Sequence, residues 1–138
     1  MCGRCNVGRR TNKDELVTYP CPCCGYLTFG DSPGSYEICE ICYWEDDALQ
    51  LRWPGMSGGA NTPSLIEAQR TFAQTGVSEA RLLKYVRPVT ASDRRDEGWR
   101  PVDLTRDSFE SWPTQQKDWP TDLTALYWWR TSFWRAER

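Results

Sequence analysis

Two cysteine pairs near the start of the chain constrain its fold more than any other feature. Cys21 and Cys24 form the first C-x-x-C pair, and Cys39 and Cys42 form the second pair after fourteen intervening residues. Two such turns supply the four thiolates that a closed, tetrahedral zinc site uses. We therefore expect these four cysteines to hold a structural Zn²⁺ ion, with iron in a rubredoxin-like site as the less favoured ion. A closed site leaves no ligand position for a substrate, so the motif indicates how the chain folds rather than a reaction.

The absence of histidine limits the chemistry that this chain can perform. None of its 138 residues is a histidine, which excludes Ser-His-Asp and Cys-His nucleophile systems, HExxH metalloproteases and zinc deaminases with a histidine ligand. Catalysis would have to rest on cysteine, carboxylates, lysine or tyrosine, and the sequence shows no convincing constellation of these. We therefore expect a protein that is not an enzyme.

Length and cysteine content indicate one small domain in a reducing compartment. We expect a flexible tail over residues 1–15 and a single metal-binding domain over residues 16–138, with a four-cysteine ribbon at 16–54 and a helical and aromatic segment at 55–138. The seven cysteines are an odd number with metal-like spacing, so a cytoplasmic location is expected rather than a secreted disulfide scaffold. No stretch approaches the roughly 20 apolar residues of a membrane span, and we see no signal peptide.

Charge in the ribbon segment bears on the partners of the protein. The formal net charge of the chain is −2, and between Leu16 and Pro54 the only cation is Arg52. The carboxylates of this segment are Asp31, Glu37, Glu40, Glu45, Asp46 and Asp47. A nucleic-acid-binding ribbon is expected to carry a basic stripe here, so the charge disfavours nucleic acid and favours a protein partner that is basic. Arginines at both ends of the chain could still make a weak contact with a polyanion.

The run Glu45, Asp46 and Asp47 is the most acidic part of the segment. We interpret it as a solvated acidic turn, with a docking patch for a basic partner as the alternative. Acid–base catalysis by this run is disfavoured, because no second set of residues supports it.

Turn and strand signals place the two cysteine pairs in a zinc ribbon. Residues 26–29 (Tyr-Leu-Thr-Phe) favour a short strand, residues 31–34 (Asp-Ser-Pro-Gly) a turn, and residues 35–38 a return strand that leads into the second pair. The sequence thus predicts a β-hairpin between the two pairs. The alternative is a treble clef, in which a helix over residues 43–50 begins at the second pair.

Helix signals follow the ribbon, and together with it they predict an α+β fold. Ser64 and Glu67 form a capping box that opens a helix over residues 65–75, with Gly76 as its stop. A second helix is expected over residues 78–86, capped by the serine at its start. One or two helices would then pack on the hairpin.

The C-terminal third is aromatic. Six of the eight tryptophans lie there, namely Trp99, Trp112, Trp119, Trp128, Trp129 and Trp134. We expect them to form core, because a chain with few aliphatic residues must bury something large. An exposed interface patch near Trp128, Trp129 and Trp134 is the alternative. Asp122 is expected to cap a last short helix.

Three further cysteines lie outside the expected ligand set. Cys23 lies between two ligands, and because adjacent residues rarely bind one ion together we expect a buried thiol. The alternatives are a reactive thiol near the metal and a ligand exchanged with Cys21 or Cys24. Cys2 and Cys5 supply only half a site, so we interpret them as incidental thiols. A second metal site completed by Cys23 or by a second chain, or a redox pair, are the alternatives.

Longer runs of sequence carry a family resemblance. Residues 19–26 (YPCPCCGY) and 33–47 (PGSYEICEICYWEDD) resemble the bacterial cysteine-rich CPCC family. The resemblance continues through Gly-Gly-Ala-Asn at 58–61 and the helix opened by Ser64, and the C-terminal tail is similar to the actinobacterial branch. It covers roughly residues 16–130. It implies a small, cytosolic, metal-binding protein without an established activity.

These observations favour a non-catalytic protein in which a structural zinc site supports a protein-interaction surface. An immunity- or antitoxin-like role would suit an acidic protein that meets a basic partner. The first alternative is a cytosolic thiol redox protein that uses Cys23 with Cys2 or Cys5. The second alternative is a nucleic-acid-binding zinc ribbon, for which binding would be sensitive to salt.

Overall fold

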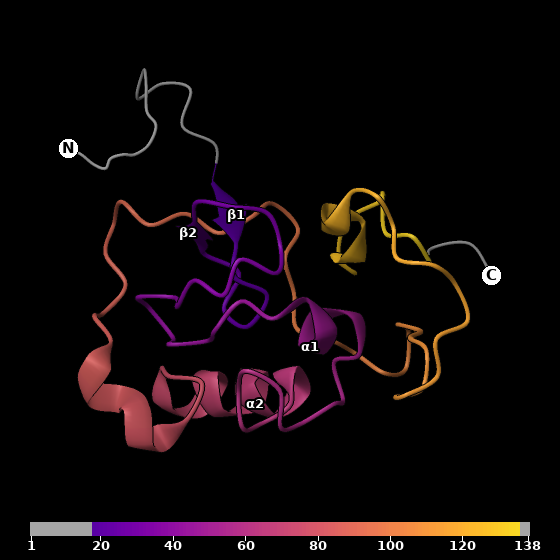
Figure 1. Cartoon of the computed structure of the whole chain (residues 1–138). Helices are drawn as coiled ribbons and strands as arrows, with labels where there is room; N and C mark the ends of the chain where they lie inside the picture. Colours follow the sequence, from indigo (N-terminus) through magenta and orange to yellow (C-terminus); the bar gives the residue numbers. More distant parts are fainter. Residues whose placement is uncertain (1–17, 136–138) are drawn as a thin grey trace.

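The computed structural model describes residues 18–135, and its regular elements are few and short. In chain order they are β1 (Tyr19–Pro20), β2 (Leu27–Phe29), α1 (Ala48–Arg52), α2 (Leu65–Thr75) and the 3₁₀ helices η2 (Ala80–Tyr85) and η3 (Leu123–Leu126). Figure 1 shows the two strands above α1 and α2, with the C-terminal third (orange to yellow) along the right-hand side. The predicted α+β class is confirmed.

The two cysteine pairs lie at the turns of two separate antiparallel arms. In the first arm β1 pairs with β2, with Tyr19 opposite Phe29. In the second arm Ile38 lies opposite Glu45. The predicted hairpin between residues 26–29 and 35–38 is therefore wrong. Each C-x-x-C turn reverses the direction of the chain, so the segments on its two sides become antiparallel neighbours, and the turn at residues 31–34 only connects the arms.

Helix α2 has the ends that the sequence predicts. The Glu67 N–H donates to Ser64 Oγ (3.1 Å), and the Ser64 N–H donates to Glu67 Oε1 (2.9 Å), which completes the capping box. Gly76 ends the helix in the left-handed conformation at φ +85°. Because both signals act within one turn of the helix, they can be recognised without knowledge of the tertiary structure.

The other helical predictions need correction. The segment predicted as a second helix is the 3₁₀ helix η2, and the Ser78 N–H donates to Cys42 O (2.7 Å), so Ser78 supports the second arm rather than a helix. Helix α1 begins at Ala48, beyond the second cysteine turn, and is only five residues long. The treble-clef alternative, in which a helix over residues 43–50 begins at the second cysteine pair, is therefore wrong. Asp122 caps η3 as predicted, through a hydrogen bond from the Thr124 N–H (3.0 Å).

Most of the acidic run at 45–47 is buried. Asp46 is 2% exposed and accepts from the Ser35 N–H (3.1 Å) and Oγ (2.7 Å). Asp47 is 4% exposed, caps α1 and accepts from the Ala60 N–H (2.8 Å). The prediction of a solvated acidic turn is therefore wrong, as is a docking patch made of the whole run. These carboxylates instead hold the backbone N–H groups of residues 35, 49 and 60 in place.

The core combines the cysteines with aromatic side chains from the end of the chain. One cluster contains the five described cysteines together with Trp44 and Leu51, and with Tyr127, Trp128 and Phe133 from the C-terminal third. The alternative of an exposed patch near Trp128, Trp129 and Trp134 is wrong, because Trp128 is 4% exposed and the other two are partly buried against the core. The exposed tryptophans are instead Trp112 (49%) and Trp119 (36%). No helix in the described part of the chain has the length and apolar character needed to cross a bilayer.

Candidate metal centre

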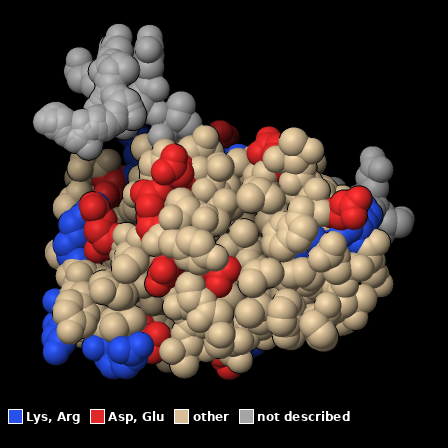
Figure 2. Space-filling view, in the orientation of Figure 1, with Lys and Arg blue, Asp and Glu red and all other residues tan. Residues whose placement is uncertain are grey.

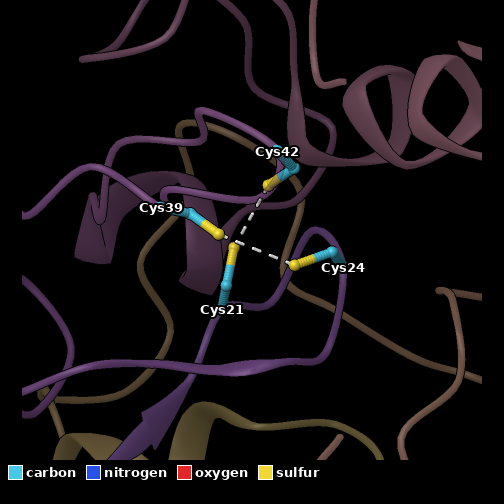
Figure 3. A group of neighbouring side chains, drawn as sticks. All are labelled: Cys21, Cys24, Cys39 and Cys42. Atoms are coloured by element: carbon cyan, nitrogen blue, oxygen red, sulfur yellow. Dashed lines mark hydrogen bonds between the residues drawn. The ribbon is translucent and has the colours of Figure 1, made fainter. Parts of the chain in front are cut away.

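The four sulfur atoms of Cys21, Cys24, Cys39 and Cys42 converge on one point (Figure 3). All four lie within 4.8 Å of one another. The Sγ atoms of Cys21 and Cys42 are 3.5 Å apart, and those of Cys24 and Cys39 are 3.7 Å apart. Sulfurs bound at about 2.3 Å to a tetrahedral zinc ion are roughly 3.8 Å apart, whereas a disulfide bond is about 2.05 Å long. These four thiols are unbridged and have the spacing to hold one metal ion.

The two turns that carry these cysteines have the same backbone hydrogen bonds. In the first, the Cys21 N–H donates to Tyr26 O (2.9 Å), and the Gly25 N–H donates to Cys21 O (2.6 Å). The second turn repeats both bonds at the same offsets, Cys39 N–H to Trp44 O (2.9 Å) and Tyr43 N–H to Cys39 O (2.8 Å). The arms therefore present two sulfurs each to the centre in closely similar geometry.

The residue after each cysteine pair has a positive φ. This residue is a glycine in the first turn and a tyrosine in the second. Gly25 has φ +84°, and a Cβ there would lie 2.5 Å from a ring atom of Trp99. The corresponding residue of the second turn is Tyr43, with φ +70° and its ring 5.5 Å from that of Tyr85. Glycine is needed in the first turn for space as well as conformation, whereas the second turn accepts an uncommon conformation for a bulky residue.

Burial and hydrogen bonds determine the electrostatics of the centre. All four thiols are fully buried. Burial raises the pKa of the Cys21 and Cys42 thiols, while hydrogen bonds from the neighbouring thiols lower the pKa of Cys39. Cys39 Sγ also accepts from Thr28 Oγ1 (3.2 Å) and the Ile41 N–H (3.4 Å). Four thiolates together would need a cation to offset their charge, and an all-sulfur donor set suits zinc or iron.

Distant residues fasten the first turn from outside. Pro22 O accepts from Gln69 Nε2 (3.0 Å) on α2 and from Trp99 Nε1 (3.2 Å), and Cys24 O accepts from Arg95 Nε (2.9 Å). In Figure 1 the chain after η2 passes over the strands and then down their right-hand side. These supports are not evident from the sequence. The one available signal was Gln69, a polar residue at helical spacing from the buried Leu65.

Cys23 is fully buried and lies outside the four-sulfur group. The prediction of a buried thiol is confirmed. Burial also raises the pKa of this thiol, which lowers its reactivity and counts against the redox alternative. Cys2 and Cys5, and the predicted tail at 1–15, lie outside the described residues.

Comparison with known proteins identifies the family. A family model described as cysteine-rich CPCC matches residues 19–93, which is more than half of the chain. The chain belongs to the cysteine-rich CPCC family. The matched CPCC-family region contains both arms, α1, α2 and η2. It ends before the aromatic C-terminal third. No curated protein matches the chain.

Proposed function

We propose that this CPCC-family protein is non-catalytic, and that a structural zinc site supports a protein-interaction surface on its second arm. The partner would be a basic protein. The observation that carries this proposal is the exposure of Tyr36 (58%) and Ile38 (47%) on an arm rich in carboxylates. An immunity- or antitoxin-like protein that covers a basic partner is one form that this function could take.

The donor set and its closed geometry support zinc as the ion. Four buried cysteine sulfurs spaced for a tetrahedron match a structural zinc site, which has no open ligand position. Iron can occupy the same shell, so the ion is tested directly. Native mass spectrometry of protein purified without a metal-binding tag should show one zinc per chain. A visible absorption spectrum from a four-sulfur iron centre would contradict the assignment.

The arrangement of titratable groups supports a role without catalysis. Across residues 18–135, the four buried cysteines are the one cluster of three or more Cys, His, Asp or Glu side chains close enough to share an ion. Their closed shell offers no position for a substrate. The sequence also contains no histidine. A zinc–thiolate site of this kind is stable where thiols stay reduced, so we place the protein in the cytoplasm.

The backbone at Tyr36 supports an interaction role for the second arm. The Tyr36 N–H donates to Asp46 O and the Asp46 N–H donates to Glu37 O, both at 2.9 Å, so two residues oppose one. Tyr36 takes the left-handed position of this bulge at φ +63°, where glycine is usual. An exposed aromatic side chain in a disfavoured conformation is typical of a residue kept for binding rather than for stability.

The charge around the arm supports a basic partner. Residues 18–51 contain six carboxylates and no lysine or arginine; Asp46 and Asp47 are buried, and Arg95 from later in the chain lies over the Tyr26 ring (4.6 Å), so the surface charge comes from the other four carboxylates. Figure 2 shows acidic side chains scattered over the left half of this face, where the arms lie in Figure 1, with Lys and Arg along the left edge and at the lower left. Arg87 compensates Glu40 through an ion pair (2.6 Å). The remaining negative field would attract a basic protein surface and repel nucleic acid.

Site-specific crosslinking tests the surface. A photoreactive phenylalanine analogue at Tyr36 keeps an aromatic side chain on the arm, and the same analogue at Leu104 (63% exposed), which lines a cleft beside α2, is the control. In cells that express the protein natively, crosslinking to one partner should occur at Tyr36 and decrease when Glu37 and Glu45 are replaced by glutamine. Equal crosslinking at both positions, or none at Tyr36, would refute this interaction surface.

A further inference from the structure

Residues 110–119 form an exposed segment whose hydrogen bonds to the rest of the described chain come from one place; its Lys117 ammonium also lies 5.5 Å from the ring centre of Trp134. This strap contains no regular element, and every residue from Ser111 to Trp119 is exposed. Glu110, at its start, is buried. Every hydrogen bond that the structure gives between the strap and the rest of the described chain is donated by Arg52 or Trp53, at the end of α1.

A buried ion pair forms the main attachment. Arg52 Nε lies 2.7 Å from Glu110 Oε1, and Arg52 Nη2 lies 3.0 Å from Glu110 Oε2, with both side chains 0% exposed. Arg52 Nη2 also donates to Lys117 O (2.7 Å). The second carboxylate oxygen of Glu110 accepts from the N–H groups of Gln116 (2.6 Å) and Lys117 (3.1 Å), which folds the strap back onto its own start.

Aromatic rings complete the attachment. The Arg52 guanidinium lies 4.7 Å from the ring centres of Trp53 and Trp119 and 4.6 Å from that of Trp134. The Trp53 ring contacts Trp112 (5.0 Å) and Trp119 (5.8 Å) edge to face, and Trp53 Nε1 donates to the strap carbonyl of Thr114 (3.1 Å). Two consecutive residues therefore hold the strap at both of its tryptophans.

The element that carries Arg52 is itself firmly held. Gln50 on α1 donates through Nε2 to the carbonyls of Met56 (3.0 Å), Asn61 (3.1 Å) and Pro63 (3.0 Å). Its Oε1 accepts from the Asn61 N–H (3.0 Å). The Gln50 hydrogen bonds do not involve the strap. The contacts of the strap to Arg52 and Trp53 can therefore break while α1 stays in place.

We propose that residues 110–119 are a releasable strap, latched to α1 by the Arg52–Glu110 ion pair. Release would uncover the indole of Trp53 and widen the adjoining cleft of about 590 Å³, which Trp53 and Trp112 both line. The ion pair suits a latch because its attractions are made only when both buried partners are in place, whereas an apolar contact would hold the strap in many positions. This inference does not depend on the proposed interaction surface of the second arm.

Trypsin provides a direct probe of the latch. Lys117 is the one lysine or arginine within residues 110–119, and its carbonyl is the group that accepts from Arg52. Cleavage after Lys117 therefore requires that this carbonyl leave the latch. Arg52→Met and Glu110→Gln should accelerate cleavage after Lys117 by about 10- to 100-fold, the range expected for loss of a charged hydrogen bond.

Cleavage after Arg70, in α2, reports opening of the rest of the domain and should stay at the wild-type rate. Arg81→Met is the matched control, because it removes an arginine from an exposed ion pair with Glu79. Equal acceleration after Lys117 and Arg70 would mean that Arg52 stabilises the whole domain, which overturns the strap. If Arg52→Met does not fold, Glu110→Gln decides, since it keeps the shape of the carboxylate. Wild-type rates after Lys117 in that variant would also overturn the proposal.

Discussion

Replacing Gly25 by alanine tests the idea that the first cysteine turn needs glycine for two reasons. The new Cβ would lie 2.5, 2.7 and 2.8 Å from three atoms of the Trp99 ring. Trp99 cannot move away freely, because its Nε1 donates to Pro22 O (3.2 Å) within the same turn. Alanine would also have to adopt φ +84°. The substitution should therefore be much more costly than the conformation alone requires.

Gly76 separates the two contributions. It has φ +85°, close to that of Gly25, but apart from its own neighbouring backbone no atom lies within 4 Å of a Cβ built on it. Gly76→Ala should reduce the free energy of unfolding by about 1 kcal/mol, the cost of the left-handed conformation for a residue with a Cβ. Gly25→Ala should lose a further 1–3 kcal/mol or so, as expected for forcing an extra carbon into a packed region. Its total loss of about 2–4 kcal/mol is a large part of the stability of a small domain.

The assay is urea unfolding followed by tryptophan fluorescence at a fixed zinc concentration, because bound metal contributes to apparent stability. The double variant Gly25→Ala/Trp99→Ala removes the ring that alanine would contact. The penalty of the alanine measured in the Trp99→Ala background should fall to that of Gly76→Ala. Equal losses for Gly25→Ala and Gly76→Ala in the wild-type background would refute the steric argument.

Three other substitutions test the arms, the centre and the latch. Tyr36→Gly should leave the free energy of unfolding unchanged or raise it by up to about 1 kcal/mol, because glycine relieves the left-handed conformation but loses more chain entropy; a clear loss in urea unfolding would contradict this. Cys39→Ser should abolish bound zinc in native mass spectrometry and remove the folded near-ultraviolet circular dichroism signal, since structural zinc contributes about 10–16 kcal/mol in zinc-finger peptides; retention of both would contradict the assigned ligand. The hydrogen bond from Arg52 holds the pKa of Glu110 below its ordinary value of 4.5, so the contribution of this carboxylate to stability is present above that value and is lost as the pH falls through the lowered pKa. Glu110→Gln should therefore show a shallower loss of stability on acidification below about pH 4.5, and an unchanged slope would contradict this.

Features that depend on a few neighbouring residues could be predicted from the sequence. The C-x-x-C spacing of each cysteine pair predicts a tight turn. The structure contains both turns and brings the sulfurs of Cys21, Cys24, Cys39 and Cys42 together. The start of α2 is encoded by Ser64 and Glu67 within one helical turn, and its end is encoded by Gly76. These local signals do not depend on the rest of the fold.

Features that depend on distant partners could not be predicted in the same way. Residues 26–29 pair with β1 and not with residues 35–38, because the sequence signal at 31–34 indicates a turn but not which strands it joins. Asp46 reads as a surface residue until Ser35, eleven positions earlier, is known to donate to it. Arg52 and Glu110 are 58 positions apart. The one sequence hint of their pairing was that Arg52 is the only cation in its segment.

The matching arms have a consequence for the entropy of the unfolded chain. Cys24 and Cys39 are 15 positions apart, so an ion bound by both pairs would close a loop of that length. A crosslink over such a loop removes about 3 kcal/mol of unfolded-chain entropy in the polymer model used for disulfides. A thiolate–metal link exchanges with free ions, unlike a covalent bond. The strength of this crosslink would therefore follow the metal supply around the protein.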